Sequence, residues 1–196
     1  MIVSYTGPMF SDKSAELIDI YRSVWNKAII IAIKPRIDTR DGAFIKSKKY
    51  PDELIPATLV DDISEIKDIV LEGNYKTVLI DEAEFLTGDV GSLVDLSVLL
   101  DVNFYISGLN MTSEQTPFGI MGSILAVSDK IVQIHGSCQD CGLPSFYTYS
   151  LDENKVEQIK VGDDYISLCP SCLKKRYLKK KNKVLALEGK LLWYIY

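Results

Sequence analysis

Hydrophobic positions along the chain form short, nearly continuous apolar runs, separated by longer segments in which they recur at helical spacing. The apolar runs predict five strands, at Met1–Thr6, Ala28–Lys34, Thr77–Ile80, Asn103–Leu109 and Lys130–Gly136. Their Ile and Val content is typical of strands covered on both faces, as in a parallel sheet. The periodic segments predict helices at Lys13–Trp25, Asp62–Glu72, Gly88–Leu100 and Gly119–Ser128. This alternation predicts an α/β fold with an open, parallel sheet.

Two regions fall outside that alternation. Arg36–Pro56 holds two prolines and a glycine without a clear period, and it predicts a long loop with room for one short strand. After Gly136 the pattern changes to a tyrosine-rich segment between two cysteine pairs, followed by a basic and then an apolar stretch. We therefore divide the chain into an α/β domain at residues 1–136, a small hairpin-based lobe at 137–176 and a tail at 177–196.

Composition narrows the class of protein. The 196 residues are 47% hydrophobic and 25% charged, which is typical of a globular protein and excludes a disordered, collagen-like or coiled-coil chain. No apolar run approaches the roughly 18 residues of a membrane span, and no basic segment leads into an apolar one at the N-terminus. We therefore expect a cytoplasmic protein without a membrane partner, in which spaced cysteines bind metal more often than they form disulfides.

Charge is distributed unevenly along the chain. The net charge of −5 combines −12 over residues 1–173 with +7 over residues 174–196. The acidic body argues against general nucleic-acid binding. The basic tail has two interpretations: a solvated helix face, or an arm that contacts nucleic acid or the acidic surface of another subunit. We expect the apolar end, Leu191–Tyr196, to pack on the body or on a neighbour.

The first chemical motif lies between the first strand and the first helix, where Gly7–Ser14 reads GPMFSDKS. The phosphate-loop pattern is G-x-x-x-x-G-K-[ST], and Gly7, Lys13 and Ser14 match it. In such a loop, backbone N–H groups surround the phosphates, the lysine reaches the β and γ oxygens, and the serine holds Mg²⁺. The sequence therefore predicts a phosphate loop, and a nucleotide-binding domain at residues 1–136.

Asp12 stands where the second glycine of this pattern belongs. Glycine keeps the backbone close to the nucleotide, whereas aspartate adds a side chain and a negative charge. Two like charges about 5 Å apart, at an effective dielectric constant of about 20, repel by roughly 3 kcal/mol, or about two powers of ten in affinity. An alternative interpretation needs no nucleotide: Ser11 or Asp12 caps the N-terminus of the following helix.

A second motif closes the third predicted strand, where Val78–Leu86 reads VLIDEAEFL. In a phosphate-loop fold, the acid at this strand end orients Mg²⁺ or its waters, and Asp81 is the candidate. Glu82 is the next residue and points to the other face of the strand. It could act as a general base on a substrate hydroxyl. Taken alone, such a pair after a strand is usually structural, so its interpretation depends on the phosphate loop.

The four cysteines form a third motif, C-x₂-C … C-x₂-C, with 27 residues between the pairs, made by Cys138, Cys141, Cys169 and Cys172. Four thiolates in two such knuckles predict a closed, tetrahedral structural Zn²⁺ site. The alternatives are two redox-active pairs or a core of reduced thiols, and neither needs this duplication. Zinc would stabilise a lobe too small to have its own core.

Together these motifs resemble the type II thymidine kinase family, which has a RecA-like phosphate-loop sheet and a C-terminal zinc lobe with a lasso-type loop. The resemblance covers about residues 1–176. The segments that carry it read GPMFSDKSAELI, IKPRIDTR, LIDEAEF, SGLN…TPFG and CQDC…DDYISLCPSC. It implies a kinase that transfers the ATP γ-phosphoryl group to the 5′-hydroxyl of thymidine, with Mg²⁺, structural Zn²⁺ and a homotetrameric assembly.

The resemblance also implies roles for particular residues. Glu82 would take the proton of the 5′-hydroxyl, and Arg40 would assist near the phosphates. The residues implied for ATP and Mg²⁺ are Gly7, Pro8, Met9, Ser11, Asp12, Lys13, Ser14, Asp38 and Asp81. Those implied for the nucleoside are Phe118, Ile159, Val161 and Tyr165.

Several positions depart from the family pattern. Besides Asp12, they are Ser47-Lys48 for Ser/Thr-His, Glu84 for Gln, Asn110 for Asp, Ser113 for a base-packing Phe, Lys160-Val161 for a glycine pair, and Pro170 for Arg. Losing an aromatic wall could remove about 1–3 kcal/mol of base stacking. Two hypotheses therefore stand beside active thymidine kinase: a catalytically impaired binding or regulatory paralogue, and a kinase for a modified nucleoside.

Overall fold

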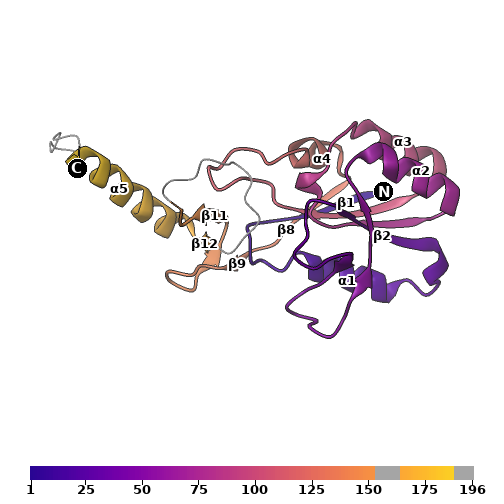
Figure 1. The fold of residues 1–196 in the computed structure, drawn as a ribbon, viewed down its shortest axis with the longest axis horizontal. Coiled ribbons are helices and arrows are strands. Elements are labelled where there is room, and N and C mark those ends of the chain that lie inside the picture. The colour runs from indigo at the N-terminus through magenta and orange to yellow at the C-terminus, as the bar shows by residue number, and fades with distance from the viewer. Residues whose placement is uncertain (153–163, 188–196) are drawn as a thin grey trace.

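The centre of the protein is a six-stranded, all-parallel sheet, seen here in a computed structural model that describes residues 1–152 and 164–187 (Figure 1). The strand order is β5-β2-β6-β7-β1-β8. The strands are β1 (Ile2–Thr6), β2 (Ile30–Pro35), β5 (Thr58–Val60), β6 (Thr77–Ile80), β7 (Asn103–Gly108) and β8 (Lys130–Gln133). The predicted α/β class and the parallel sheet are confirmed.

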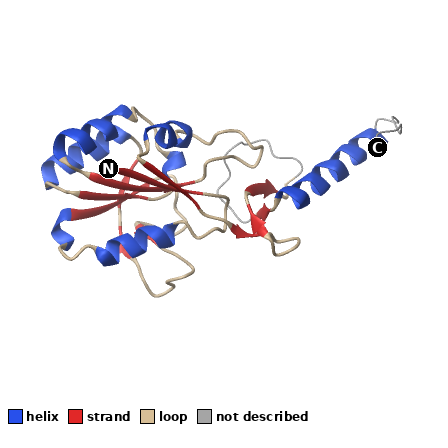
Figure 2. Ribbon diagram, turned by 180° about the vertical axis from the view of Figure 1, so that it is seen from behind, coloured by secondary structure: helices blue, strands red, loops and turns tan. Residues whose placement is uncertain are grey.

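Helices cover both faces of this sheet, as Figure 2 shows. On one face lie α2 (Ile63–Gly73), α3 (Gly91–Leu100) and α4 (Met121–Val127), and on the other α1 (Ser14–Ser23). Successive strand residues point to opposite faces, so Val78 and Ile80 join the core under α2, α3 and α4, whereas Leu79 joins the core under α1. This is why each central strand is a continuous apolar run. Two short 3₁₀ helices complete the layers, η1 (Lys27–Ile29) and η2 (Ala83–Phe85).

The segment predicted as a long loop with one short strand is more ordered than expected. It contains an antiparallel pair, β3 (Phe44–Ile45) and β4 (Ile55–Pro56), and β5 follows directly as an edge strand that the sequence analysis did not predict. The side chains of Ile45 and Ile55 are buried in the core under α1. A strand of two or three residues is too short to establish a period of two, so no pattern announced these elements.

After β8 the chain forms the predicted small lobe from two antiparallel pairs. These are β9 (Gly136–Ser137) with β10 (Pro144–Ser145), and β11 (Tyr147–Ser150) with β12 (Tyr165–Leu168). Helix α5 (Pro170–Leu187) then projects away from the sheet (Figure 1) and runs without a break across residue 176, where we divided lobe from tail. Ile159, Val161 and the apolar end at Leu191–Tyr196 lie outside the described residues.

No helix within residues 1–152 and 164–187 is long and apolar enough to cross a membrane. Exposed lysines follow the described part of α5, Lys174, Lys175, Lys179 and Lys180 among them. This agrees with the solvated-face interpretation of the basic stretch as far as residue 180. The interpretation as a nucleic-acid arm stays a prediction.

Candidate active site

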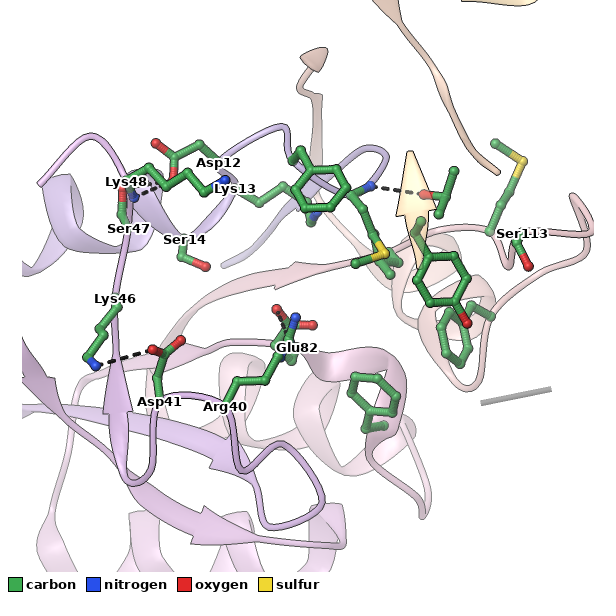
Figure 3. Close-up of a pocket in the computed structure, with 18 of the residues that line it drawn as sticks. Asp12, Lys13, Ser14, Arg40, Asp41, Lys46, Ser47, Lys48, Glu82 and Ser113 are labelled. Atoms are coloured by element: carbon green, nitrogen blue, oxygen red, sulfur yellow. Dashed lines mark hydrogen bonds and ion pairs between the residues drawn. The ribbon is translucent and has the colours of Figure 1, made fainter. Parts of the chain in front are cut away.

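A cavity of about 490 Å³ opens where β1, β2, β6 and β7 end, against the small lobe (Figure 3). Parallel strands bring the segments that follow them to the same edge of a sheet, where open α/β folds bind ligands. Eight residues predicted for the site line this cavity: Met9, Asp12, Lys13, Ser14, Arg40, Glu82, Phe118 and Tyr165. Five others lie outside the lining of this cavity: Gly7, Pro8, Ser11, Asp38 and Asp81. Of these, Pro8, Asp38 and Asp81 accept hydrogen bonds from Lys13, Arg40 and Ser14 respectively.

The loop after β1 has the tight backbone that the motif predicts. A Cβ atom at Gly7 would lie 2.1 Å from the carbonyl oxygen of Ile134, so only glycine fits there. Lys13 is buried, and its Nζ donates to the carbonyl oxygen of Pro8 at 3.0 Å. Ser11 Oγ donates to the same oxygen at 2.9 Å. Lys13 therefore closes the loop on itself and lies where the motif predicts a phosphate-binding lysine.

The capping interpretation of this segment was wrong. Helix α1 has Lys13 at its N-cap position, and no side chain there accepts a hydrogen bond from the first turn. Instead, the Asp12 carboxylate accepts hydrogen bonds from Ser47 Oγ at 2.8 Å and from the backbone N–H groups of Lys48 and Lys49 at 3.2 and 3.0 Å. These donors lie 35–37 residues away in sequence, so the repulsion expected between Asp12 and a phosphate was derived without them.

Ser14 and Asp81 lie together, as a Mg²⁺ site would require. Ser14 Oγ lies 3.0 and 2.9 Å from the two carboxylate oxygens of Asp81, and Ser107 Oγ also donates to Asp81. Burial, reinforced by the charge of Glu82, raises the pKa of Asp81 to about 6, although the two serine hydroxyls oppose that rise. Hydroxyl and carboxylate oxygens are the ligands that Mg²⁺ prefers, so these two side chains fit the ion.

Glu82 is held by a chain of charged groups that begins in the core. Lys34 Nζ lies 3.0 Å from Asp38 Oδ2, Asp38 Oδ1 lies 2.7 Å from Arg40 Nε, and Arg40 Nη2 lies 2.9 Å from Glu82 Oε1. Burial alone would raise the pKa of Asp38, but hydrogen bonds from Arg40 and Lys34 outweigh it and hold that pKa below its ordinary value. The network therefore keeps Asp38 ionised and directs Arg40 at Glu82.

The backbone at Glu82 is strained. Its φ of 52° and ψ of 41° lie in the left-handed region. This backbone conformation costs a residue such as glutamate about 1–3 kcal/mol, and residues that adopt it cluster at functional sites. This conformation turns the chain directly after β6, so that Asp81 is buried while Glu82 remains 20% exposed at the cavity. The consecutive acids thus face different surroundings because of this turn, and not because they alternate along β6, which ends at Ile80.

Glu84 is a buried carboxyl without hydrogen bonds to the described residues. It packs against Gly108 and Gly119, where an added Cβ atom would lie 2.7 Å from Glu84 Oε2 and 1.8 Å from Glu84 O. Burial, reinforced by the charge of Glu82, raises the pKa of Glu84 well above its ordinary value, and Lys13 opposes this only in part. Burial therefore favours the neutral form of Glu84. A neutral carboxyl has nearly the shape of the Gln carboxamide that the resembled family usually has here.

The end of the cavity next to the lobe is apolar. The rings of Phe85 and Phe118 meet edge to face, with centroids 5.4 Å apart, and Leu109, Met111 and Tyr165 continue this wall. Ser113 lines the cavity as well. The sequence analysis did not name Phe85, although the motif LIDEAEF contains it. An aromatic wall beside charged groups suits a ligand with one flat, apolar end.

The four cysteines come together in the small lobe. Their Sγ atoms lie within 4.8 Å of one another, so the group could hold a zinc ion, as its spacing predicted. Cys138 and Cys141 lie in the turn after β9, and Cys169 and Cys172 lie at the start of α5. Leu168 and Leu173 are buried beside them. This small apolar cluster is the core of the lobe.

The lobe also forms part of the cavity. The backbone N–H of Met9 in the phosphate loop donates to Thr148 Oγ1 at 2.9 Å. Thr148 on β11 and Tyr165 on β12 both line the cavity. Lys34, Ser107 and Thr148 were not predicted as site residues, although the segments IKPRIDTR and SGLN contain the first two. Only their position in the fold brings them to the site.

Comparison with known proteins gives consistent matches. The sequence model of a family described as thymidine kinase matches residues 1–173. A thymidine kinase of Mycoplasma genitalium is 31% identical over 185 residues, which cover 90% of this chain and 86% of the relative. A thymidine kinase of Coprothermobacter proteolyticus is 34% identical over 140 residues, or 70% of this chain and 68% of the relative. One of Onion yellows phytoplasma is 32% identical over 157 residues, or 78% and 73%.

The raised pKa of Glu84 predicts a dependence of stability on pH. Because its pKa is raised in the folded protein, the folded protein keeps a proton that the unfolded chain releases above its ordinary pKa of 4.5. Stability from this group is therefore complete at low pH and is lost as pH rises. The loss amounts to about 1.4 kcal/mol per pH unit, or roughly 3 °C in melting temperature.

Glu84→Gln removes this titration while keeping the shape of the side chain. Its melting temperature should rise relative to that of the unmodified protein as pH increases from 5 to 7, measured by scanning calorimetry. Glu72→Gln, the same change at an exposed position of α2, serves as the control and should show no such divergence. Parallel curves for Glu84→Gln and the unmodified protein would contradict a protonated Glu84.

Proposed function

The chain belongs to the thymidine kinase family, and we propose that it transfers the γ-phosphoryl group of ATP to the 5′-hydroxyl of thymidine. The observation that carries this proposal is the pairing of Glu82 with Arg40 at 2.9 Å, between a phosphate loop and an aromatic wall in one cavity. A phosphoryl transfer needs a base at the acceptor hydroxyl and positive charge near the donor. The family match favours this function over the hypothesis of a non-catalytic paralogue.

On the donor side, the phosphate loop binds the triphosphate of ATP. Backbone N–H groups of the loop and the N-terminus of α1 face the phosphates, and Lys13 exchanges its hydrogen bond to Pro8 for the β and γ oxygens. Ser14 and Asp81 would hold Mg²⁺, which would neutralise charge on the phosphates. Asp38 supports this side indirectly, because it holds Arg40.

On the acceptor side, Glu82 takes the proton of the 5′-hydroxyl. The 5′-oxygen then bonds to the γ-phosphorus, the bond from that phosphorus to the bridging oxygen breaks, and ADP leaves. Arg40 keeps the carboxylate of Glu82 in place through the 2.9 Å contact. Its second partner, Asp38, prevents Arg40 from turning away. Positioning and charge account for the catalysis in this scheme.

The thymine ring lies against the aromatic wall. Phe85, Phe118 and Tyr165 offer flat apolar surfaces, and Met111 can adapt to the edge of the ring. These rings offer base contacts even though position 113 carries serine instead of phenylalanine. Ile159 and Val161, which the resemblance also implies for the nucleoside, lie outside the described residues.

Further properties complete the proposal. The four cysteines hold structural Zn²⁺, and the chain works as a cytoplasmic homotetramer. Its parts are a nucleotide-binding domain at residues 1–136, a zinc lobe at 137–176 and a basic tail at 177–196. The spacing of the cysteines and the approach of their sulfur atoms support the metal. The resemblance stated above supports the assembly.

Glu82→Gln tests the catalytic role. Removing the base while keeping the side-chain shape should lower kcat about 10²–10⁴-fold, with little change in thymidine affinity, because the aromatic wall is untouched. ADP release is followed with thymidine, ATP and Mg²⁺, and thymidine binding is followed by calorimetry. Glu72→Gln on the exposed face of α2 is the matched control. An unmodified protein that releases no ADP in response to thymidine would overturn the function, and an unchanged kcat in Glu82→Gln would overturn the role of Glu82.

Cys172→Ser tests the zinc site and its connection to the cavity. We expect about one zinc per chain in the unmodified protein, and loss of that zinc in the variant. Because Thr148 and Tyr165 belong to the same lobe, the KM for thymidine should rise. Ser171→Ala, an exposed neighbour in the sequence, should change neither quantity. Metal analysis and steady-state kinetics measure both, and metal-free protein with full activity would refute the site.

A further inference from the structure

The segment 46–50 lies directly on the phosphate loop, and Asp12 is what joins them (Figure 3). The carboxylate accepts three hydrogen bonds, from Ser47 Oγ and from two consecutive backbone N–H groups, those of Lys48 and Lys49. Ser47 is buried by this contact, and its Oγ in turn accepts from Lys49 N at 3.0 Å. A glycine at position 12 could make none of these bonds. The residue that departs from the phosphate-loop pattern is therefore the one that holds the neighbouring segment.

The backbone of Asp12 explains how the side chain reaches this segment. Its φ is +59°, in the left-handed region that the missing glycine would favour. Aspartate tolerates this conformation better than most residues, because its short polar side chain can form local hydrogen bonds. The loop thus keeps the backbone shape that the motif requires, and the side chain is free to bind outside the loop.

Helix α1 fixes the rest of the segment. Asp19 accepts a hydrogen bond from Tyr50 Oη at 2.6 Å and one from Lys49 Nζ at 3.0 Å. The guanidinium of Arg22 lies 3.9 Å from the centre of the Tyr50 ring. Asp12 and Asp19 therefore attach the segment at two points. Asp12 lies in the phosphate loop, and Asp19 lies in the second turn of α1.

This attachment brings a second lysine to the phosphate side of the cavity. Lys48 lines the cavity together with Lys13, and its Nζ lies 5.2 Å from the centre of the Phe10 ring. Other basic groups of the wall are occupied: Arg40 pairs with Glu82, and Lys46 pairs with Asp41 at 3.2 Å. Within the described part of the chain, Lys48 makes no ion pair. Its ammonium group is available to an anion in the cavity.

We propose that Asp12 is a positioning residue, which fastens residues 47–49 to the phosphate loop so that Lys48 binds the phosphates of the nucleotide donor. The inference rests on the proposed kinase function and adds to it a second lysine for the donor. It also reverses the first interpretation of Asp12. The Asp12 carboxylate accepts three hydrogen bonds, which stabilise its negative charge. Lys48, which it positions, adds a positive charge to the same wall of the cavity.

Calorimetric binding of Mg²⁺-ADP tests this proposal without turnover. Lys48→Ala should weaken binding about tenfold, which is typical of one lost charged hydrogen bond. Asp12→Gly, which suits the left-handed backbone, should weaken it by a similar factor. Lys67→Ala removes the same charge from an exposed position of α2 and should leave binding unchanged. Asp12→Asn keeps part of the hydrogen bonding and should fall between Asp12→Gly and the unmodified protein.

A double-mutant cycle separates positioning from a general effect on the fold. If Asp12 acts through Lys48, Asp12→Gly should have little further effect when Lys48 is already alanine. Cleavage by trypsin after Lys48 or Lys49 should also be faster in Asp12→Gly, because the segment has lost its attachment. Additive effects, or tighter binding of Mg²⁺-ADP by Asp12→Gly, would overturn the proposal.

The proposed function and this inference fail in different ways. Thymidine-dependent ADP release with additive variants would leave the kinase intact and refute the role of Asp12. Lys48-dependent binding of Mg²⁺-ADP without any turnover of thymidine would support the positioning and refute the kinase function. Thymidine affinity should remain unchanged in every variant, because neither Asp12 nor Lys48 is part of the aromatic wall that contacts the base.

Discussion

The site depends on the parallel pairing of the strands. Because β1, β2, β6 and β7 all run in the same direction, the segments that follow them leave the sheet at one edge. Ser14 can therefore contact Asp81 across 67 positions of sequence. If β6 ran the other way, Asp81 and Glu82 would lie at the opposite edge, roughly 13 Å away for a strand of four residues. The apolar runs that specify the sheet thus also determine where the charges meet.

Burial of charge is the second constraint, and the protein meets it in two ways. Lys34 and Asp38 are both 2% exposed and pair with each other at 3.0 Å, since an unpaired buried charge would cost several kcal/mol. Asp38 also binds Arg40, and this contact orients the guanidinium toward Glu82 at the cavity. Glu84 has no such partner among the described residues, and burial instead raises its pKa well above the ordinary value, which favours the neutral form. Structural stability and the arrangement of the site therefore rest on the same groups.

Local patterns in the sequence predicted much of the fold and of the site. Three short motifs carried these predictions: GPMFSDKS between a strand and a helix, the acids after β6, and the two cysteine pairs. In the described structure, residues of the first two motifs line one cavity, and the four cysteines lie together in the small lobe. The contacts of Asp12 could not be predicted, because its partners lie in a segment without a period. The short strands β3, β4 and β5 could not be predicted either, because each is too short to show a period. Lys34 pairs with Asp38 only four residues away, but nothing in the sequence showed that both side chains would be buried.

The departures from the family pattern have different physical explanations. At Glu84, burial favours the neutral carboxyl, which has nearly the shape of glutamine, and Asp12 accepts three hydrogen bonds that glycine could not make. Ser113 removes one aromatic surface, and the rings of Phe85 and Phe118 remain in the cavity wall. The structure does not explain Pro170 in place of Arg.

The most direct test of the central claim is a crystal structure with thymidine, ADP and Mg²⁺. Our account predicts the 5′-oxygen within about 2.6–3.2 Å of the Glu82 carboxylate, with the thymine ring on Phe85 and Phe118 and the ADP phosphates at Lys13. A nucleoside bound elsewhere, or a 5′-oxygen directed away from Glu82, would contradict it.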